Sequence, residues 1–206
     1  MKKTSLLFLA IIALISSAFI KPIVNESKPI TVVIDAGHGG YDFGATSNDT
    51  YEKVIVSQIA EKVKSLNENK DITILFTRTS DEFITLDKRT NYINSVKPDL
   101  ILSLHVNSSS DHQKSGVDFY VSNDSSFFEK SNEIANKLNQ EFTKNTTLKV
   151  SDVKKAPYNI LKKSDSPAVL IELGYLSNPN DKKYLTDDEE QNKIAKNIIS
   201  FLSELK

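Results

Sequence analysis

The fold is decided by two apolar stretches that each lead into a histidine: TVVIDAGHGG at residues 31–40 and LILSLHVN at residues 100–107. Both have the composition of strands buried in the middle of a parallel sheet. The carboxyl ends of such strands gather along one edge, so His38 and His105, two of the three histidines in the chain, can meet there. This placement predicts a metal site.

Strand-like and helix-like segments alternate outward from these stretches. The alternation is typical of βαβ units and predicts a single α/β domain with a largely parallel sheet. The expected strands are 31–36, 71–78, 99–106, 116–122, a short one near 148–153 and 167–171, and the expected helices are 51–68, 85–96, 126–143 and 187–205.

The composition limits the function classes. With 206 residues and 39% hydrophobic content the chain can bury one core, and 26 basic against 27 acidic residues give a formal charge of −1. The basic residues are scattered, so we expect no nucleic-acid partner. The chain has no cysteine, so any bound metal must use nitrogen and oxygen ligands.

The N-terminus has the pattern of an export signal. Lys2 and Lys3 precede an apolar run at 6–15 and small residues at 16–18, which predicts a signal peptide over 1–20. An uncleaved anchor or a buried helix is the alternative. We interpret 21–29, which includes Pro22 and Pro29, as a linker and 30–206 as the domain. The expected location is the periplasm or cell envelope, with membrane contact only through the signal, and we expect a monomer.

A catalytic zinc commonly takes a third protein ligand, a histidine or a carboxylate. Glu52 is the best candidate, because the first turn of the helix after the first strand returns to the sheet edge beside His38. Its alternative role is a favourable charge at a helix N-terminus. Asp35 is placed to orient the site from behind the ligands. Three residues are weaker candidates for the third ligand: Asp42 and Asp49 in the loop that follows the first strand, and His112 in the polar stretch 108–115.

Three further charged residues stand out. Glu172 directly follows an apolar run, where burial would raise its pKa and suit it to proton transfer, although a hydrogen-bonded strand-end carboxylate is equally consistent. Arg78 and Arg89 lie near Asp81 and Asp87, and we interpret them as ion pairs that fix loops, with binding of a substrate carboxylate as the alternative.

Several motifs together resemble one family, from about residue 30 to the C-terminus. VVIDAGHGGYDFGA, Glu52-Lys53, the TR and D of 77–81, the L, R and N of 86–94, SLHVNSS and PAVLIELGYLSNP are similar to the zinc-dependent N-acetylmuramoyl-L-alanine amidases of the amidase 3 family. Two departures are the loop 46–50, which lacks the usual glycines, and Tyr175, where phenylalanine is commoner.

The resemblance implies a fold, a site and a substrate. The fold would be a mixed six-stranded sheet covered by helices. His38, Glu52 and His105 would hold Zn²⁺, and Glu172 would be the catalytic carboxylate. The substrate would be peptidoglycan, cut between N-acetylmuramic acid and L-alanine. A zinc peptidase or an inactive wall-binding or regulatory module are the alternatives.

The resemblance also raises the question of control. In some relatives a helix blocks the site until a protein activator displaces it. The stretch between His105 and Glu172 is too short for a long plug, so we expect an unblocked site. Whether a protein activator is required stays undecided at this point.

Overall fold

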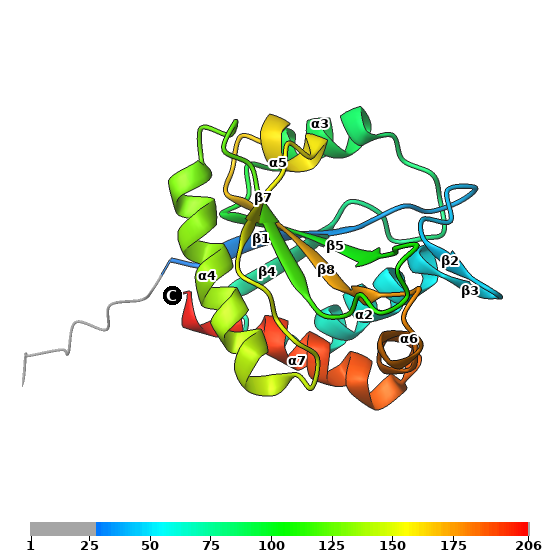
Figure 1. Cartoon of the computed structure of the whole chain (residues 1–206). Helices are drawn as coiled ribbons and strands as arrows, with labels where there is room; N and C mark the ends of the chain where they lie inside the picture. The colour runs from blue at the N-terminus through cyan, green and yellow to red at the C-terminus, as the bar shows by residue number, and fades with distance from the viewer. Residues whose placement is uncertain (1–27, 206) are drawn as a thin grey trace, which may run out of the picture.

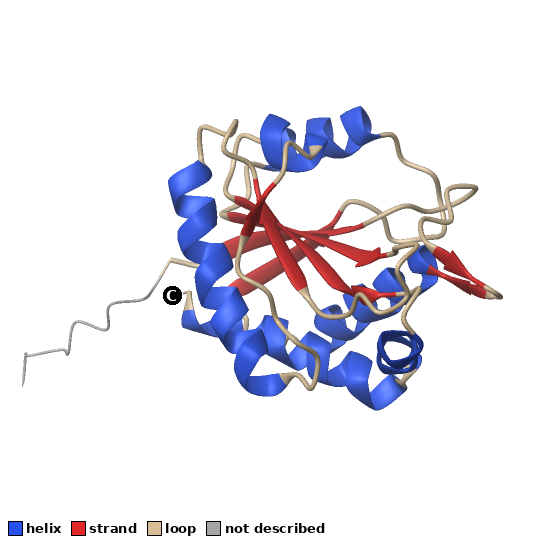
Figure 2. Ribbon diagram, in the orientation of Figure 1, coloured by secondary structure: helices blue, strands red, loops and turns tan. Residues whose placement is uncertain are grey.

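The computed structural model describes residues 28–205, so the predicted signal peptide (1–20) and most of the linker lie outside the described residues. The main sheet has six strands. It crosses the molecule between two layers of helices (Figures 1 and 2). Chain order and bounds are β1 Ile30–Ala36, β2 Thr46–Ser47, β3 Thr50–Tyr51, α2 Glu52–Leu66, β4 Ile72–Phe76, α3 Leu86–Val96, β5 Leu100–Asn107, β6 Asp118–Val121, α4 Phe128–Asn145, β7 Lys154–Lys155, α5 Asn159–Lys163, β8 Ala168–Tyr175, α6 Pro179–Thr186 and α7 Asp188–Glu204.

The strand order places the carboxyl ends of β1 and β5 side by side. The order is β4-β1-β5-β8-β6-β7, and β4, β1, β5 and β8 are mutually parallel. β6 runs antiparallel to β8, and β7 is parallel to β6, which makes the sheet mixed. The chain leaves β1 for β4 on one side and then returns to β5 on the other side. Such a reversal of strand order opens a crevice at the strand ends, where ligands bind in α/β sheets.

The two faces of the sheet carry cores of different size. α2, α4 and α7 pack over one face, and α3 and α5 cover part of the other (Figure 1). The larger core includes Val56, Ile59, Leu138, Phe142 and Ile198, all fully buried. The smaller core contains seven buried residues: Val33, Ile93, Ile101, Ile160, Leu161, Ala168 and Leu170. α2 packs onto the larger core through an apolar stripe that includes Val56 and Ile59, because residues three and four apart share one helix face.

The sequence predicted the long elements and missed the short ones. The largely parallel α/β sheet is confirmed. The loop 46–50 proves to belong to a small hairpin, β2–β3, turned through Asn48 at φ +51°. The short strand expected near 148–153 lies instead at 154–155, with an isolated bridge at Val150. α5 and α6, of five and eight residues, were not predicted.

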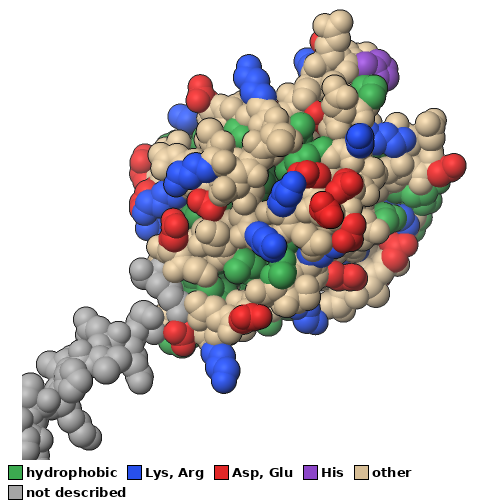
Figure 3. Space-filling view, turned by 90° about the horizontal axis from the view of Figure 1, so that it is seen from below, with side chains coloured by type: hydrophobic (Ala, Val, Ile, Leu, Met, Phe, Trp, Pro, Cys, Tyr) green, Lys and Arg blue, Asp and Glu red, His purple; other side chains and the backbone are tan. Residues whose placement is uncertain are grey.

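The surface seen from below in Figure 1 carries both signs of charge. Basic and acidic side chains are interspersed across it, and no large area of one sign stands out on this face (Figure 3). Within residues 28–205, no helix combines the length and hydropathy needed to cross a bilayer.

Candidate metal centre and cleft

His38 lies in a tight turn just beyond β1. The turn closes through paired backbone hydrogen bonds between Gly39 and Asp42, and His38 itself adopts φ +59°, a left-handed conformation unusual for a residue with a side chain. Nδ1 of His38 lies 2.9 Å from a carboxylate oxygen of Asp42. A carboxylate on one imidazole nitrogen fixes the ring and directs the other nitrogen outward, as metal-binding histidines require.

Glu52 is the first residue of α2, and its carboxylate points into the protein. The side chain is buried, and backbone N–H groups of Ala45 and Val106 donate to its two oxygens at 2.7 and 2.9 Å. These donors come from the loop before the β2–β3 hairpin and from β5. The hairpin therefore returns the chain to the sheet edge, and the predicted approach of Glu52 toward His38 is seen in the structure.

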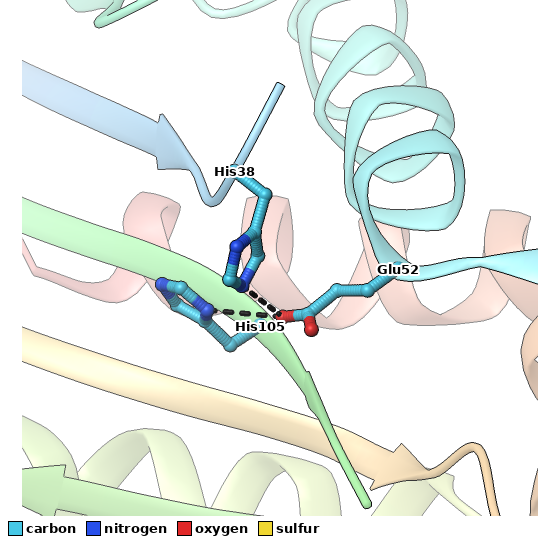
Figure 4. A group of neighbouring side chains, drawn as sticks. All are labelled: His38, Glu52 and His105. Carbon is cyan, nitrogen blue, oxygen red and sulfur yellow. Dashed lines mark hydrogen bonds and ion pairs between the residues drawn. The ribbon is translucent and has the colours of Figure 1, made fainter. Parts of the chain in front are cut away.

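His38, Glu52 and His105 converge on one point from three segments (Figure 4). Oε1 of Glu52 lies 3.1 Å from Nε2 of His38 and 3.0 Å from Nδ1 of His105. One donor atom from each residue falls within 4.8 Å of the other two. Zinc bonds of about 2.0–2.2 Å in tetrahedral geometry set ligand atoms about 3.3–3.6 Å apart, close to the observed separations, so this donor set fits a divalent zinc ion.

Charge is concentrated at this centre. Burial alone would raise the pKa of Glu52, but the hydrogen bonds and charges of His105 and His38 outweigh it and hold the pKa at about 2. For His38, burial would lower the pKa, yet Glu52 and Asp42 raise it to about 9. The carboxylate is thus ionised and attracts positive charge, which a proton or a bound cation can supply.

Glu172 lies beside this centre on the neighbouring strand. In the parallel pairing of β5 and β8, it is the register partner of His105. Its Oε2 is buried and has no hydrogen-bond partner among the described residues. Burial raises the pKa of Glu172 to about 7. The charge of His105 acts to lower this pKa, and the negative charge of Glu52 raises it further. The apolar run before Glu172 predicted this shift.

A cavity of about 330 Å³ lies over the two histidines and Glu172. Residues 83–86 and 158–160 form its walls, and Leu170 and Arg89 also contribute to the lining. The cavity is therefore placed at the crevice created by the reversal of strand order, and a ligand in it would contact both histidines and Glu172.

Comparison with known proteins identifies the family. The family model described as N-acetylmuramoyl-L-alanine amidase, amidase 3, matches residues 32–204. This chain belongs to the amidase 3 family. It is 32% identical over 184 residues to a probable cell wall amidase, LytH, of Staphylococcus saprophyticus, an alignment that covers 88% of this chain and 60% of that protein.

Solved structures of family members share the fold. The catalytic domain of CwlV, an N-acetylmuramoyl-L-alanine amidase from Bacillus (Paenibacillus) polymyxa, superposes with a TM-score of 0.80 at 32% identity, covering 85% of this chain and 97% of that one. The CwlD amidase of Clostridioides difficile, solved in complex with the GerS lipoprotein, gives 0.78 at 28% identity, covering 85% and 97%. The single α/β domain with a mixed six-stranded sheet is therefore the fold of amidase 3 catalytic domains.

Two buried arginines hold the turn that carries His38 in this family member. Arg78 donates to the carbonyls of Ala36 and Gly37, and Arg89 donates to those of Ala36 and His38. Arg89 also pairs with the buried Asp35 at 2.7 Å. Four charge-assisted hydrogen bonds thus fix three successive carbonyls and stabilise the left-handed conformation of His38.

The predicted partners of these arginines were wrong, although their role in fixing loops was right. Asp81 pairs with Lys53 and Asp87 pairs with Lys163. The role of orienting His38 belongs to Asp42, because Asp35 is bonded to Thr77, Ser103 and Arg89 and acts on the turn through Arg89.

Two glycines of the site are required by close approach. A Cβ atom on Gly37 would lie 2.4 Å from the ring of His105, and one on Gly44 would lie 2.5 Å from Oε2 of Glu52 and 2.7 Å from the ring of His38. Gly44 also has φ +66°. A side chain at Gly37 or Gly44 would push the ligands apart. The glycines of GHGGYDFG therefore allow close packing around the ligands as well as the backbone turn.

The remaining candidates lie away from the centre. His112 is exposed, and its Nδ1 lies 2.7 Å from the carbonyl of Ser177. Asp49 is exposed in the β2–β3 turn. The sequence reading missed Asp118, the register partner of Glu172 across β6 and β8, which is buried and accepts a hydrogen bond from the hydroxyl of Tyr175. A carboxylate within the apolar stretch 116–122 was the available signal.

Proposed function

We propose that this chain is a zinc-dependent N-acetylmuramoyl-L-alanine amidase that hydrolyses the amide between N-acetylmuramic acid and L-alanine of peptidoglycan. The observation that carries the proposal is the convergence of His38, Glu52 and His105, with both histidines and the neighbouring Glu172 lining one cavity. Membership of the amidase 3 family supports the substrate assignment.

The proposed ligands are His38 through Nε2, His105 through Nδ1 and Glu52 through Oε1. A zinc ion bound there would supply Lewis-acid polarisation of a carbonyl group and would make water more acidic. Asp42 keeps the ring of His38 in the required orientation, and the N–H groups of Ala45 and Val106 hold Glu52. The ligand set is therefore built before any cation arrives.

Glu172 is the proposed general base and acid. Its buried oxygen lacks a hydrogen-bond partner within residues 28–205, and its pKa of about 7 lets it exchange a proton near neutral pH. Glu172 would take the proton of the attacking water and return it to the departing amine nitrogen of L-alanine. The two glutamates therefore divide the work between cation binding and proton transfer.

We also propose where the chain acts. The chain spans 60% of the length of its LytH relative, a probable cell wall amidase. That name and the signal-like start of the sequence support action outside the cytoplasm, in the periplasm or cell envelope. The complex of the CwlD amidase with the GerS lipoprotein supports a search for a protein partner. We propose that the chain itself is a monomer.

Mass spectrometry of digested peptidoglycan tests the function. Purified protein supplied with zinc should release stem peptides that begin with L-alanine, and removal of the metal by a chelator should stop the release until zinc is returned. Metal analysis should give one zinc per chain. Glycan strands should remain full length, because only the amide is cut.

Two other product patterns would contradict the proposal. Fragments shorter than the stem peptide would indicate a zinc peptidase acting within it. Binding to the wall without any product, by a folded protein that holds one zinc, would indicate an inactive wall-binding or regulatory module.

A further inference from the structure

Two stacked aromatic rings stand at the mouth of the cavity. The rings of Tyr41 and Phe83 lie 4.3 Å apart between centroids at an interplanar angle of 28°. Tyr41 is 74% exposed and Phe83, which lines the cavity, is 39% exposed. Large aromatic side chains exposed at the rim of a cavity indicate a ligand-binding surface, since they bury little apolar area within the chain itself.

The pair is held rigidly by the loops that carry it. The N–H of Gly40 donates to Asp81 at 2.8 Å, and Nζ of Lys53 donates to both the carbonyl of Gly40 and Asp81 at 2.7 Å. A Cβ on Gly40 would lie 2.7 Å from the backbone nitrogen of Phe83. The backbone that carries the two rings is thus fixed before binding, which lowers the entropy cost of using them.

The two walls of the cavity differ in chemistry. The wall at 83–86 contributes three apolar side chains to the lining: Phe83, Ile84 and Leu86. The wall at 158–160 contributes the apolar Ile160, but also the phenol of Tyr158 and the carboxamide of Asn159, whose Oδ1 has no hydrogen-bond partner within residues 28–205. A peptide needs partners for its N–H and C=O groups when it leaves water, so the wall at 158–160 suits the peptide.

We infer that Phe83, backed by Tyr41, is a stacking surface for the pyranose ring of N-acetylmuramic acid. This inference rests on the proposed function and deepens it, because it assigns the sugar to one wall and leaves the other to the peptide. The ring of a pyranose presents C–H groups on its faces and hydroxyls around its edge. Its C–H face can lie on the electron-rich face of an aromatic ring while the hydroxyls stay in water at the open rim.

The sharpest test pairs two variants with two soluble substrates. One substrate is an N-acetylmuramoyl peptide, and the other is the same peptide carrying only a lactyl group in place of the whole sugar. Phe83→Leu keeps the wall apolar and removes the flat ring. It should raise KM for the sugar substrate about 3- to 10-fold, the range expected for one aromatic contact, and leave KM for the lactyl substrate unchanged. Phe83→Trp, which keeps a flat aromatic ring, should have the same KM for the sugar substrate as the parent.

Tyr92→Leu is the matched control. Tyr92 is 37% exposed, close to the value for Phe83, and it lies on α3 outside the cavity lining. This variant should change neither KM. An equal rise of KM on both substrates in Phe83→Leu would place the peptide on this wall and overturn the inference, and so would an unchanged KM on both.

A binding measurement separates this inference from the proposed function. Glycan strands stripped of stem peptides are the ligand, and the Glu172→Gln protein, with or without Phe83→Leu, is the probe. Retention of the probe on the strands should fall about 3- to 10-fold when Phe83 is replaced. Equal retention would overturn the stacking surface even if the amidase activity were found. A failure of the amidase assay with a clear Phe83 effect on retention would count against the proposed function alone.

Discussion

Glu52 and Glu172 are two carboxylates at one site with opposite surroundings. Glu52 accepts two backbone N–H bonds and lies against two imidazoles, and its pKa is held at about 2. Glu172 has one buried oxygen without a partner among the described residues, and burial raises its pKa to about 7. A bonded carboxylate stays charged and can hold a cation, whereas a desolvated one can exchange a proton. The number of donors supplied by the fold thus separates the two roles.

Replacing each glutamate in turn should give the largest difference. Glu172→Gln keeps the shape of the side chain and removes its proton exchange, so kcat should fall about 10²- to 10⁴-fold while zinc content is unchanged. Glu52→Gln should lose bound zinc as well as turnover, because a ligand is gone. Turnover on peptidoglycan and metal analysis of the same preparations measure both.

A different pattern would break the comparison. Loss of zinc from Glu172→Gln would make Glu172 a ligand, and near-parent turnover by that variant would remove its role in proton transfer.

The network behind His38 should affect the ligand half of the site. Arg89→Met leaves Asp35 as a buried, unpaired charge and frees the carbonyl of His38, so the free energy of unfolding should drop by about 3–5 kcal/mol. Urea unfolding of the metal-free protein measures it.

Lys88→Met, one residue earlier and exposed, is the control and should unfold as the parent does. If Arg89→Met matched Lys88→Met in stability, the buried pair would not hold the turn that presents His38.

The raised pKa of Glu172 predicts a smaller, pH-dependent effect on stability. Its pKa is about 7 in the folded protein against an ordinary 4.5, so folding favours the protonated form. Its contribution is fully present below pH 4.5 and is lost as the pH rises to about 7. With the metal removed by a chelator, the free energy of unfolding of Glu172→Gln relative to that of the parent should therefore rise by about 1–3 kcal/mol between pH 5 and pH 8.

Glu133→Gln provides the comparison for that measurement. Glu133 is an exposed helix residue whose pKa is lowered to about 2 by Lys137 and Lys130, so it does not titrate between pH 5 and pH 8. A flat difference for Glu172→Gln over the same range would show that its carboxylate is ionised in the folded protein throughout.

The sequence predicted the parts of the site that depend on strand ends. His38, His105 and Glu172 each follow or end an apolar run, and the parallel order of those runs is dictated by the helices between them. The long helices α2 and α7 were also predicted, because a large core selects apolar residues at three- and four-residue spacing. Such signals are local in the sequence and strong.

The sequence could not predict which groups bond to the carboxylates. The donors to Glu52 are backbone N–H groups of Ala45 and Val106, and any residue type could supply them. Arg89 pairs with Asp35, 54 positions away, rather than with the nearby Asp87. Long-range pairing of this kind is fixed by the sheet register and by burial, which no spacing rule encodes.

The short elements were not predicted correctly for a related reason. α5 has five residues and no side-chain cap, so neither periodicity nor a capping residue marks it. β7 is two residues long and lies at the edge of the sheet. Both are held by their neighbours in space, and α5 carries part of the cavity wall that was therefore not predicted.

The unequal cores on the two faces of the sheet have a consequence for how substrate enters. Glu52 belongs to α2, which is anchored in the large core, whereas the wall at 158–160 runs into α5 over the small one. Segments with few buried apolar contacts open at lower free energy than the rest of a protein. The wall at 158–160 can therefore move outward to admit a bulky, cross-linked polymer, while the cation-binding residues and the opposite wall, which is tied down through Gly40 and Asp81, keep their positions.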